Sequence, residues 1–516
     1  MDEIVEQIRA TRLLRRRLQE DPQRPRYHLV PPEGFFNDAN GALFWRGRYH
    51  IFYLARTPIP EPELGEGERW VEVWDHASSA DLVHWTFHRP ALEPSADGST
   101  PRGIWSGGAV AGAPQPTLIY HVPGQGTCIS TSDDPLLEQW KPHPANPVIP
   151  QTDGKEYVVF DPCGWYDGKH YYALVGNRNR RAGYEGDSTS LFRSADLAEW
   201  EYLGPFYRSR RDWTGEEDAA CPDFFALGDR HMLLMHGHKP YFQCHYYLGT
   251  FSISDRATDE PPFLPSEHGR MTWPGGSIAG PETLSDAEGR RIFFGWVAEA
   301  SSTTGSRDWT AAGWASVMSL PRVIELGESG GLRITPAPEV EQLRTDHVTA
   351  PECAVSTTPY QLPVAGDCLE LQVMIDPGRT DSTTLAVRST PDREEETRII
   401  ADRNSGLLVV DVSRSTLDKS IRYPRYSNAL IGNVSEEERY TTEQRVPLLL
   451  GRGELLHLRL FLDRSILEIF VNERLCVTQR IYPTRHDATA VRLWADGPGA
   501  RLVSFDAWSM APALPW

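Results

Sequence analysis

Short apolar and aromatic stretches, separated by frequent Gly and Pro, follow one another through the first two thirds of the chain. A Gly-containing turn leads directly into such a stretch at residues 47–53, 167–172, 228–233 and 289–294. Gly tolerates the positive φ of a tight turn, and aromatic and β-branched residues favour strands. The pattern therefore predicts many short antiparallel strands joined by tight turns.

A short motif recurs within this region. Ser, Asp-Leu or Leu, and then Trp appear in order at residues 79–85, 132–140 and 194–200, an interval of about 55–60 residues. A unit of this size holds several strands and matches one blade of a β-propeller. The repeats predict a five-bladed β-propeller over residues 26–335.

The hydrophobic pattern changes after a polar connector at residues 336–349. Residues 369–375 and 456–462 alternate apolar and polar side chains with a period of two, which is typical of half-buried antiparallel strands. We therefore expect a C-terminal β-sandwich over residues 350–516. Residues 1–25 have the pattern of a short amphipathic helix, so the expected class is all-β with one N-terminal helix.

Charge and composition narrow the function classes. Asp and Glu number 71 against 52 Lys and Arg, a formal net charge of −19, and so acidic a chain is repelled by nucleic acid and by anionic membranes. No apolar run reaches the length of a membrane span, and the N-terminus lacks an apolar signal core. The seven cysteines are scattered and show no CxxC spacing. These features predict a cytoplasmic protein without a metal or other cofactor.

Several longer motifs, in a fixed order, carry a resemblance to a known family. They are residues 28–31 (HLVP), 35–41 (FFNDANG), 47–53 (GRYHIFY), 74–77 (WDHA), 105–108 (WSGG), 160–162 (FDP), 220–223 (ACPD), 313–322 (GWASVMSLPR) and 463–472 (DRSILEIFVN). In these motifs the chain resembles the invertases, inulinases and levanases of glycoside hydrolase family 32. The resemblance implies a propeller followed by a sandwich, and cleavage of a fructofuranoside or related furanoside in an oligosaccharide.

The resemblance also implies the acidic groups of a retaining mechanism. Such a mechanism needs two carboxyl groups about 5–5.5 Å apart. Asp38 aligns with the family's nucleophile and Asp161 with its transition-state stabiliser. We expect the amides of Asn37 and Asn40 to hold the Asp38 carboxylate in its ionised form. From the residues alone, Asp38 also fits an Asx turn, and Asp161 fits an ordinary extended residue before Pro.

The family's third acidic group is missing. Its acid/base Glu would stand at position 220, where this chain has Ala220. Residues two apart in a strand share a face, which favours Asp218 as a replacement, whereas a β-bulge would present Glu217 instead. Glu282 is a further candidate, and the acidic run before Ala220 also fits a plain solvated loop.

Further departures from the family pattern gather at the substrate. Phe160 replaces the family's Arg and Leu54 replaces a Gln, so both changes remove polar contacts to sugar hydroxyls. Trp74, Trp105 and Trp314 are placed to stack on a sugar ring. The expected substrate-binding set is Asn37, Asn40, Trp74, Trp105, Ser106, Phe160, Glu282 and Trp314.

Three functions are consistent with these motifs and with their departures from the family pattern. The first is a retaining glycosidase that acts on an oligosaccharide or small glycoside. The second is a non-hydrolytic carbohydrate-binding protein that lost hydrolysis with its acid/base group. The third is a transglycosylase or rearranging enzyme on an unusual fructose-containing sugar.

Overall fold

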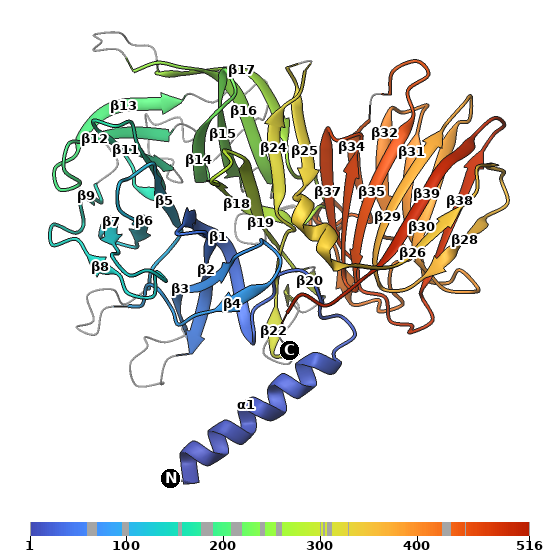
Figure 1. The fold of residues 1–516 in the computed structure, drawn as a ribbon, viewed down its shortest axis with the longest axis horizontal. Helices are drawn as coiled ribbons and strands as arrows, with labels where there is room; N and C mark the ends of the chain where they lie inside the picture. The colour runs from blue at the N-terminus through green and yellow to red at the C-terminus, as the bar shows by residue number, and fades with distance from the viewer. Residues whose placement is uncertain are drawn as a thin grey trace.

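Strands make up almost all the regular structure of the computed structural model, and one long helix lies at the N-terminus (Figure 1). This helix, α1 (Asp2–Glu20), projects from the body, and its last turn anchors it. Leu18 is buried there, and Arg15 Nε donates to Glu33 Oε2 at 3.0 Å. The all-β class and the N-terminal helix are confirmed. The structure describes residues 2–58, 70–94, 103–152, 157–176, 189–207, 219–237, 243–253, 261–299, 301–302, 305–306, 312–328, 330–425, 435–448 and 450–514.

Antiparallel runs of four strands succeed one another along the first part of the chain. The runs are β1 (Gly34–Trp45), β2 (Arg48–Pro58), β3 (Trp70–Ser79) and β4 (Trp85–Phe87); β5 (Gly107–Ala111), β6 (Thr117–Val122), β7 (Gly126–Thr131) and β8 (Lys141–Pro142); β10 (Phe160–Tyr166), β11 (Tyr171–Gly176), β12 (Thr189–Ser194) and β13 (Glu201–Tyr207); β14 (Ala220–Leu227), β15 (Arg230–Gly237), β16 (Gln243–Phe251) and β17 (Phe263–Arg270); and β18 (Ile278–Ser285), β19 (Arg291–Val297), β24 (Arg322–Leu326) and β25 (Leu332–Pro336). Shorter strands accompany them: β9 (Ile149–Pro150), β20 (Ser301–Ser302), β21 (Gly305–Ser306), β22 (Trp314–Ala315), β23 (Val317–Met318) and β33 (Ile421–Arg422).

The repeated Ser/Leu/Trp motif forms the same turn each time. The Leu residues of the three copies, Leu82, Leu137 and Leu197, have φ values of 63°, 58° and 70°. In each copy the N–H of an Asp donates to the Ser hydroxyl two residues earlier, at 3.1–3.2 Å. The Trp three residues after each Leu stands at or just before the start of an outer strand. The repeat in the sequence is therefore a turn that precedes the outermost strand in three of the runs, β4, β8 and β13.

The first strands of these runs surround a common axis. Strand β1 contacts β5 and β18, strand β10 contacts β5 and β14, and β14 contacts β18. Side chains near the starts of these strands consequently converge, although they are far apart in the sequence. Strands β5 and β10 also pair directly in one nine-stranded sheet, so strand pairing does not by itself separate the blades, and their expected number of five stays a prediction.

The C-terminal part of the chain is a sandwich of two sheets (Figure 1). One sheet has the order β26 (Arg344–Ala350), β39 (Arg501–Met510), β29 (Cys368–Asp376), β35 (Leu456–Asp463), β36 (Ile466–Val471) and β37 (Leu475–Arg480), with β27 (Cys353–Ala354) beside β39; the other has the order β28 (Tyr360–Ala365), β38 (Ala490–Asp496), β30 (Ser382–Ser389), β31 (Thr397–Asp402), β32 (Leu407–Asp411) and β34 (Glu443–Pro447). In β29, Leu371, Val373 and Ile375 are buried, whereas Gln372 and Met374 are half-buried. The period-two pattern thus supplies the core between the sheets.

Buried charged groups join the sandwich to the propeller. His28 Nδ1 lies 2.9 Å from Asp463 Oδ2, and both side chains are fully buried. Arg322 pairs with Glu468 at 3.3 Å, also without solvent contact. Breaking such a pair leaves an uncompensated buried charge, so these contacts fix how the two parts dock.

The connector between the two parts is structured. It holds the 3₁₀ helix η2 (Pro338–Leu343), and β26 begins directly after it. A second short helix, α4 (Glu436–Arg439), lies within the sandwich part of the chain. The expected domain limits stay predictions. None of the helices in the described part of the chain is both long and apolar enough to pass through a membrane.

Candidate active site

A cavity of about 320 Å³ opens where the first strands converge. Its walls hold three carboxyl side chains together with aromatic, aliphatic and basic groups. The lining residues are Asn37, Asp38, Leu54, Arg56, Glu72, Trp105, Ser106, Phe160, Asp161, Ala220, Cys221, His236 and Trp296. Both expected catalytic carboxylates therefore reach one cavity, as do Asn37, Trp105, Ser106 and Phe160 of the expected substrate-binding set.

Three β-bulges bring the central residues of the cavity together. The pairing register shifts between Phe36 and Ala39 in β1, which frames Asp38. It shifts again between Phe160 and Pro162 in β10 and at the start of β14. At these two later bulges, Asp161 and Cys221 adopt φ values of 32° and 45°. A bulge re-aims a side chain, and backbone strain of this kind gathers at functional sites.

Asp38 is fixed from several sides. The Ser106 hydroxyl donates to Asp38 Oδ2 at 2.7 Å. Asn37 Oδ1 accepts from the Asp38 backbone N–H at 2.8 Å, and Asn40 Nδ2 donates to the Asp38 carbonyl oxygen at 3.0 Å. The expectation for the two amides is corrected in its detail: both amides bond the backbone of Asp38, Asn40 Oδ1 also accepts from the Gly107 N–H at 3.1 Å, and the Ser106 hydroxyl contacts the Asp38 carboxylate. Asn40 is itself buried and absent from the cavity wall.

The Cys221 thiol lies between the two carboxylates. Its sulfur is 3.7 Å from Asp38 Oδ2 and 3.6 Å from Asp161 Oδ2, and its backbone N–H donates to Asp161 Oδ2 at 3.4 Å. Burial raises the pKa of the thiol well above its ordinary value, and the charges of Asp38 and Asp161 add to this rise. The thiol thus stays neutral, and the two carboxylates face each other across one sulfur atom.

The position of the missing acid lies on the cavity wall. Ala220 is 1% exposed and lines the space beside Cys221, so no proton donor stands where the family places one. Glu217 and Asp218 lie outside the described residues, and their suggested roles stay predictions.

One side of the cavity is apolar and aromatic. The rings of Trp105 and Phe160 meet edge to face, with centroids 6.2 Å apart, and Leu54 lines the same space. An unpaired sugar hydroxyl costs free energy against such a wall. All three side chains, which the sequence analysis associated with the substrate, therefore line this cavity, and their contact with a substrate stays a prediction.

Two tryptophans expected to stack on the sugar lie elsewhere. Trp74 is fully buried, and its Nε1–H donates to the Trp105 carbonyl at 3.0 Å. Trp314 is also fully buried, and its indole donates to Asp21 Oδ2 at 2.8 Å. Neither ring lies on the cavity wall, so both are corrected to core residues, because each indole N–H finds its partner inside the protein.

Glu282 lies behind the wall of the cavity. It is 6% exposed, and its Oε1 accepts from the Ala42 N–H at 3.0 Å. Burial raises its pKa well above the ordinary value, and nearby Asp223 raises it further. Glu282 therefore fills a buried position off the cavity wall, and the expectation that it contacts the substrate is corrected.

The sequence motifs did not indicate several of the residues that line the cavity. Arg56 and Glu72 face each other across β2 and β3, and Arg56 Nε donates to Glu72 Oε1 at 3.1 Å. His236 Nδ1 accepts from the Gly280 N–H at 3.2 Å, and Trp296 completes the wall. The pairing of β2 with β3, which sets Arg56 opposite Glu72, was the signal that could have joined these two residues. Among the described residues, no cluster of three or more His, Cys, Asp or Glu side chains could hold a metal ion.

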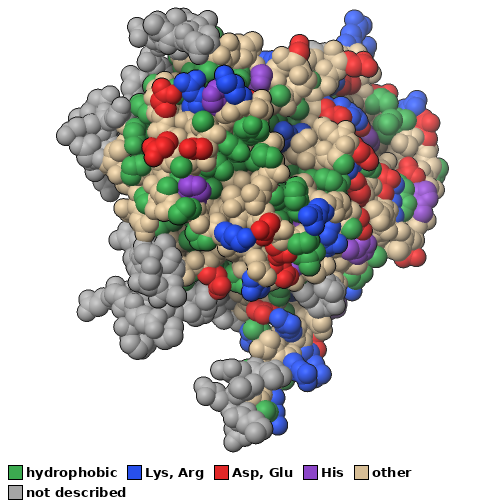
Figure 2. Space-filling view, turned by 60° about the vertical axis from the view of Figure 1, so that its left-hand side comes forward, with side chains coloured by type: hydrophobic (Ala, Val, Ile, Leu, Met, Phe, Trp, Pro, Cys, Tyr) green, Lys and Arg blue, Asp and Glu red, His purple; other side chains and the backbone are tan. Residues whose placement is uncertain are grey.

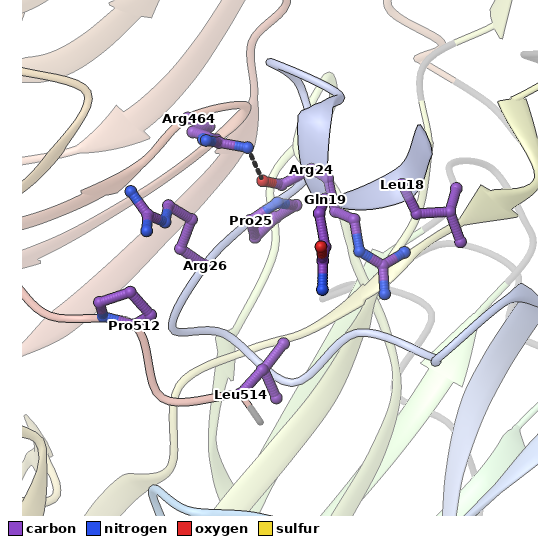
Figure 3. Close-up of a pocket in the computed structure, with 8 residues that line it drawn as sticks. All are labelled: Leu18, Gln19, Arg24, Pro25, Arg26, Arg464, Pro512 and Leu514. Carbon is purple, nitrogen blue, oxygen red and sulfur yellow. Dashed lines mark hydrogen bonds between the residues drawn. The ribbon is translucent and has the colours of Figure 1, made fainter. Parts of the chain in front are cut away.

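A second cavity of similar volume has a basic lining without carboxyl groups. It lies between the end of α1, the segment at residues 24–26 and residues near the C-terminus (Figure 3). Arg464 Nη1 donates there to the Arg24 carbonyl at 3.1 Å. Its lining contains three arginines and no carboxyl group, so it lacks the acidic pair that glycoside cleavage needs.

On the side of the molecule seen in Figure 2, neither acidic nor basic side chains gather into one large patch. Acidic and basic side chains are interspersed over the body, and Arg side chains stand out on the projecting helix α1 at the bottom of the view (Figure 2). The overall charge of −19 is thus not concentrated into one acidic patch on this face.

The fold is a β-propeller followed by a β-sandwich, and two carboxylates face each other at the propeller axis. This combination is that of a glycosidase. Residues 28–336 match the family model of the glycosyl hydrolases family 32 N-terminal domain, and residues 339–509 match that of the glycosyl hydrolases family 32 C terminal. The chain therefore belongs to glycosyl hydrolases family 32, a family of enzymes that hydrolyse O-glycosyl bonds, and the resemblance noted in the sequence is confirmed.

Characterised proteins resemble the chain over nearly its whole length. It is 26% identical to a sucrose-6-phosphate hydrolase of Zymomonas mobilis subsp. mobilis, with 95% of this chain and 92% of that protein covered. It is 28% identical to an insoluble β-fructofuranosidase isoenzyme of Arabidopsis thaliana, covering 95% and 91%. The crystal structure of fructan 1-exohydrolase IIa from Cichorium intybus has the same fold, with a TM-score of 0.78, 23% identity, and 96% and 98% of the two chains covered.

Proposed function

We propose that this protein is a retaining glycosidase that hydrolyses a β-fructofuranoside. The observation that carries the proposal is the facing pair Asp38 and Asp161, whose Oδ2 atoms flank the Cys221 sulfur in one cavity. The family and the names of its relatives support a fructofuranoside as the substrate class.

Each carboxylate has a distinct role in this proposal. Asp38 attacks the anomeric carbon of the sugar and forms a covalent glycosyl ester, which water then hydrolyses. The Ser106 hydroxyl, 2.7 Å from Asp38 Oδ2, orients the attacking carboxylate. Asp161 binds sugar hydroxyls and stabilises the positive charge that develops on the ring.

The apolar wall shapes the choice of substrate. Phe160 and Leu54 stand where family members carry polar groups, so this cavity binds fewer hydroxyls on that side. We therefore propose a fructofuranoside whose remaining part is less polar or differently linked than in sucrose. A comparison of kcat/KM for sucrose, inulin and aryl β-fructofuranosides tests this preference.

Replacement of the nucleophile tests the activity itself. Asp38→Asn should lower kcat on every cleaved fructofuranoside by at least about a thousandfold, because an amide is a far weaker nucleophile than a carboxylate. The melting temperature should change little, since Asp38 is only half-buried. Retained turnover in a correctly folded Asp38→Asn variant would exclude the proposed mechanism.

Ala220 favours one second candidate, a sugar-binding protein without hydrolytic activity. An aryl β-fructofuranoside offered with azide separates the two, because a good leaving group needs no acid and azide needs no base. Cleavage indicates the glycosidase, and saturable binding without cleavage indicates the binding protein. Mass spectrometry of the products would also reveal sugar transfer.

The proposed location is the cytosol. All seven cysteines are free thiols, which supports a reducing compartment. Fractionation of cells that produce the protein tests this location.

A further inference from the structure

The proposed cleavage needs a proton for its leaving oxygen, and one carboxyl group among the described lining residues is left to supply it. Among the lining residues the carboxyl groups are Asp38, Asp161 and Glu72. Asp38 is the proposed attacking group, and Asp161 is the proposed stabiliser of positive charge, so both act as carboxylates. Glu72 is the third carboxyl on this wall.

The two oxygens of Glu72 have different surroundings. Oε1 accepts from Arg56 Nε at 3.1 Å. Oε2 is buried and has no hydrogen-bond partner within the described part of the chain. The side chain as a whole is 18% exposed, at the cavity. A buried carboxyl oxygen without a partner is costly, and a turn of the partly exposed side chain toward the cavity would let a bound sugar hydroxyl or the glycosidic oxygen supply that partner.

The backbone of Glu72 is held against the segment that carries Ser106. The Ile104 N–H donates to the Glu72 carbonyl at 3.0 Å. A Cβ added at Gly103 would lie 2.2 Å from the same carbonyl oxygen, so only Gly permits this approach. Ser106, two residues after Ile104, bonds Asp38. One short segment therefore fixes Glu72 and Asp38 relative to each other.

The charges around Glu72 suit a group that holds a proton. Burial raises its pKa above the ordinary value, and the negative charge of Asp38 in β1 adds to this rise. The ion pair with Arg56 in β2 lowers the pKa of Glu72 and so opposes this rise. The described residues of the neighbouring segment, Gly103 and Ile104, carry no charge.

We propose that Glu72 is the general acid and base of this enzyme and replaces the family group missing at Ala220. This inference rests on the proposed function. As Asp38 forms its bond to the anomeric carbon, the proton on Glu72 moves to the glycosidic oxygen and the carbon–oxygen bond breaks. The Glu72 carboxylate then takes a proton from water as that water attacks the anomeric carbon and releases Asp38. The sum is one glycoside and one water giving the free sugar, a hemiketal, and the released alcohol.

The test compares Glu72→Gln with a matched control on two substrates. Sucrose, replaced throughout by inulin if the wild type cleaves only the latter, has a poor leaving group, and 4-nitrophenyl β-D-fructofuranoside has a good one. Glu72→Gln should lower kcat/KM about 10²–10⁴-fold on sucrose and less than about tenfold on the aryl substrate. Azide should accelerate the variant on the aryl substrate and yield fructosyl azide. Equal losses on both substrates, or no loss, would overturn the proposal.

The control is the same Glu-to-Gln change in a Glu–Arg ion pair that lies outside the cavity. Glu267 in β17 pairs with Arg230 at 3.0 Å, much as Glu72 pairs with Arg56. Glu267→Gln should leave both activities unchanged. Glu217→Gln and Asp218→Asn complete the series: a leaving-group-dependent loss in either of these, and not in Glu72→Gln, would contradict the proposal.

The wild-type protein offers a second measurement if Glu72→Gln fails to fold. The value of kcat/KM for sucrose should fall as Glu72 loses its proton at rising pH, whereas the value for the aryl substrate should not. Matching alkaline limbs for the two substrates would overturn the proposal. Absence of wild-type activity on both substrates, or aryl cleavage by Asp38→Asn, would instead refute the proposed function.

Discussion

Gly280 packs directly against the carboxylate of Asp38. A Cβ placed on Gly280 would lie 2.5 Å from Asp38 Oδ1. Gly280 has a φ of +48° and occupies a bulge between Ala279 and Pro281 in β18. The last run of the propeller thus positions the proposed nucleophile, which belongs to the first.

Gly280→Ala should therefore damage activity. The added methyl group must push Asp38 aside, and a left-handed backbone costs a non-Gly residue about 1–2 kcal/mol. We expect kcat/KM to fall at least about tenfold, since small displacements of a reacting group are costly. Gly289→Ala is the control, because Gly289 has a φ of +78° and nothing within 4 Å of an added Cβ. It should lose similar stability and keep full activity; a loss of activity in both variants would contradict this explanation.

Ser106→Ala removes the hydroxyl that donates to Asp38 Oδ2. A hydrogen bond to a charged group contributes about 1.5–3 kcal/mol, so kcat/KM should fall about 10–100-fold. Steady-state kinetics measure the loss, and thermal unfolding checks that Ser106→Ala remains folded at the assay temperature. As a comparison, Ser130→Ala removes a hydroxyl 3.0 Å from the Tyr120 hydroxyl within the propeller, and activity should remain. Full activity in Ser106→Ala would show that the contact does not orient the nucleophile.

Cys221 should resist alkylation despite lining the cavity. Its thiol has a pKa raised by burial and by both carboxylates, and the thiolate is the reactive form. Iodoacetamide at pH 8, followed by mass spectrometry of the peptides, should modify Cys353 before Cys221. Asp161→Asn removes one of the negative charges, so it should speed the reaction of Cys221 several-fold. Rapid modification of Cys221 in the wild-type protein would be inconsistent with a thiol held neutral between carboxylates.

Asp75 gives the stability of the protein a defined pH dependence. Burial, followed by the charges of Glu93 and Glu33, raises its pKa to about 6. Between about pH 4 and pH 6 the folded state therefore binds more protons than the unfolded state, so the free energy of unfolding falls as pH rises through this window.

Asp75→Asn removes this ionisation. The variant should be about 1–2 kcal/mol more stable than the wild type at pH 7.5. At pH 4.5 the difference should be clearly smaller, because the folded state then keeps the proton on Asp75, although the unfolded carboxyl is already mostly ionised. Urea unfolding at both pH values measures the difference. A stabilisation of equal size at both would show that it does not arise from the charge.

The arrangement of strands could be predicted because it depends on local pattern. Leu82, Leu137 and Leu197 recur at intervals set by the blade, and each marks the same turn. In β29 the alternation of apolar and polar residues defines the buried face without reference to any other strand. Asp38 and Asp161 were likewise identified through motifs contiguous in the sequence.

The partners of these residues could not be predicted in the same way. The sequence placed Trp74 and Trp314 at the sugar, yet their indole N–H groups bond the Trp105 carbonyl and Asp21 inside the protein. It assigned the Asn37 and Asn40 amides to the carboxylate of Asp38, whereas they bond the backbone of Asp38 and, from Asn40, that of Gly107. These choices depend on which groups lie nearby in space.

The sequence by itself thus determined the strands, the turns between them and the acidic residues of the centre, because each of these follows from side-chain periodicity or from a short contiguous motif. The tertiary structure alone decided that Glu72 shares a cavity with Asp38, that a thiol separates the two carboxylates, and that Gly280 presses on the nucleophile. These contacts join residues from different runs of strands around one axis, and their distances depend on bulges and packing that no local pattern encodes.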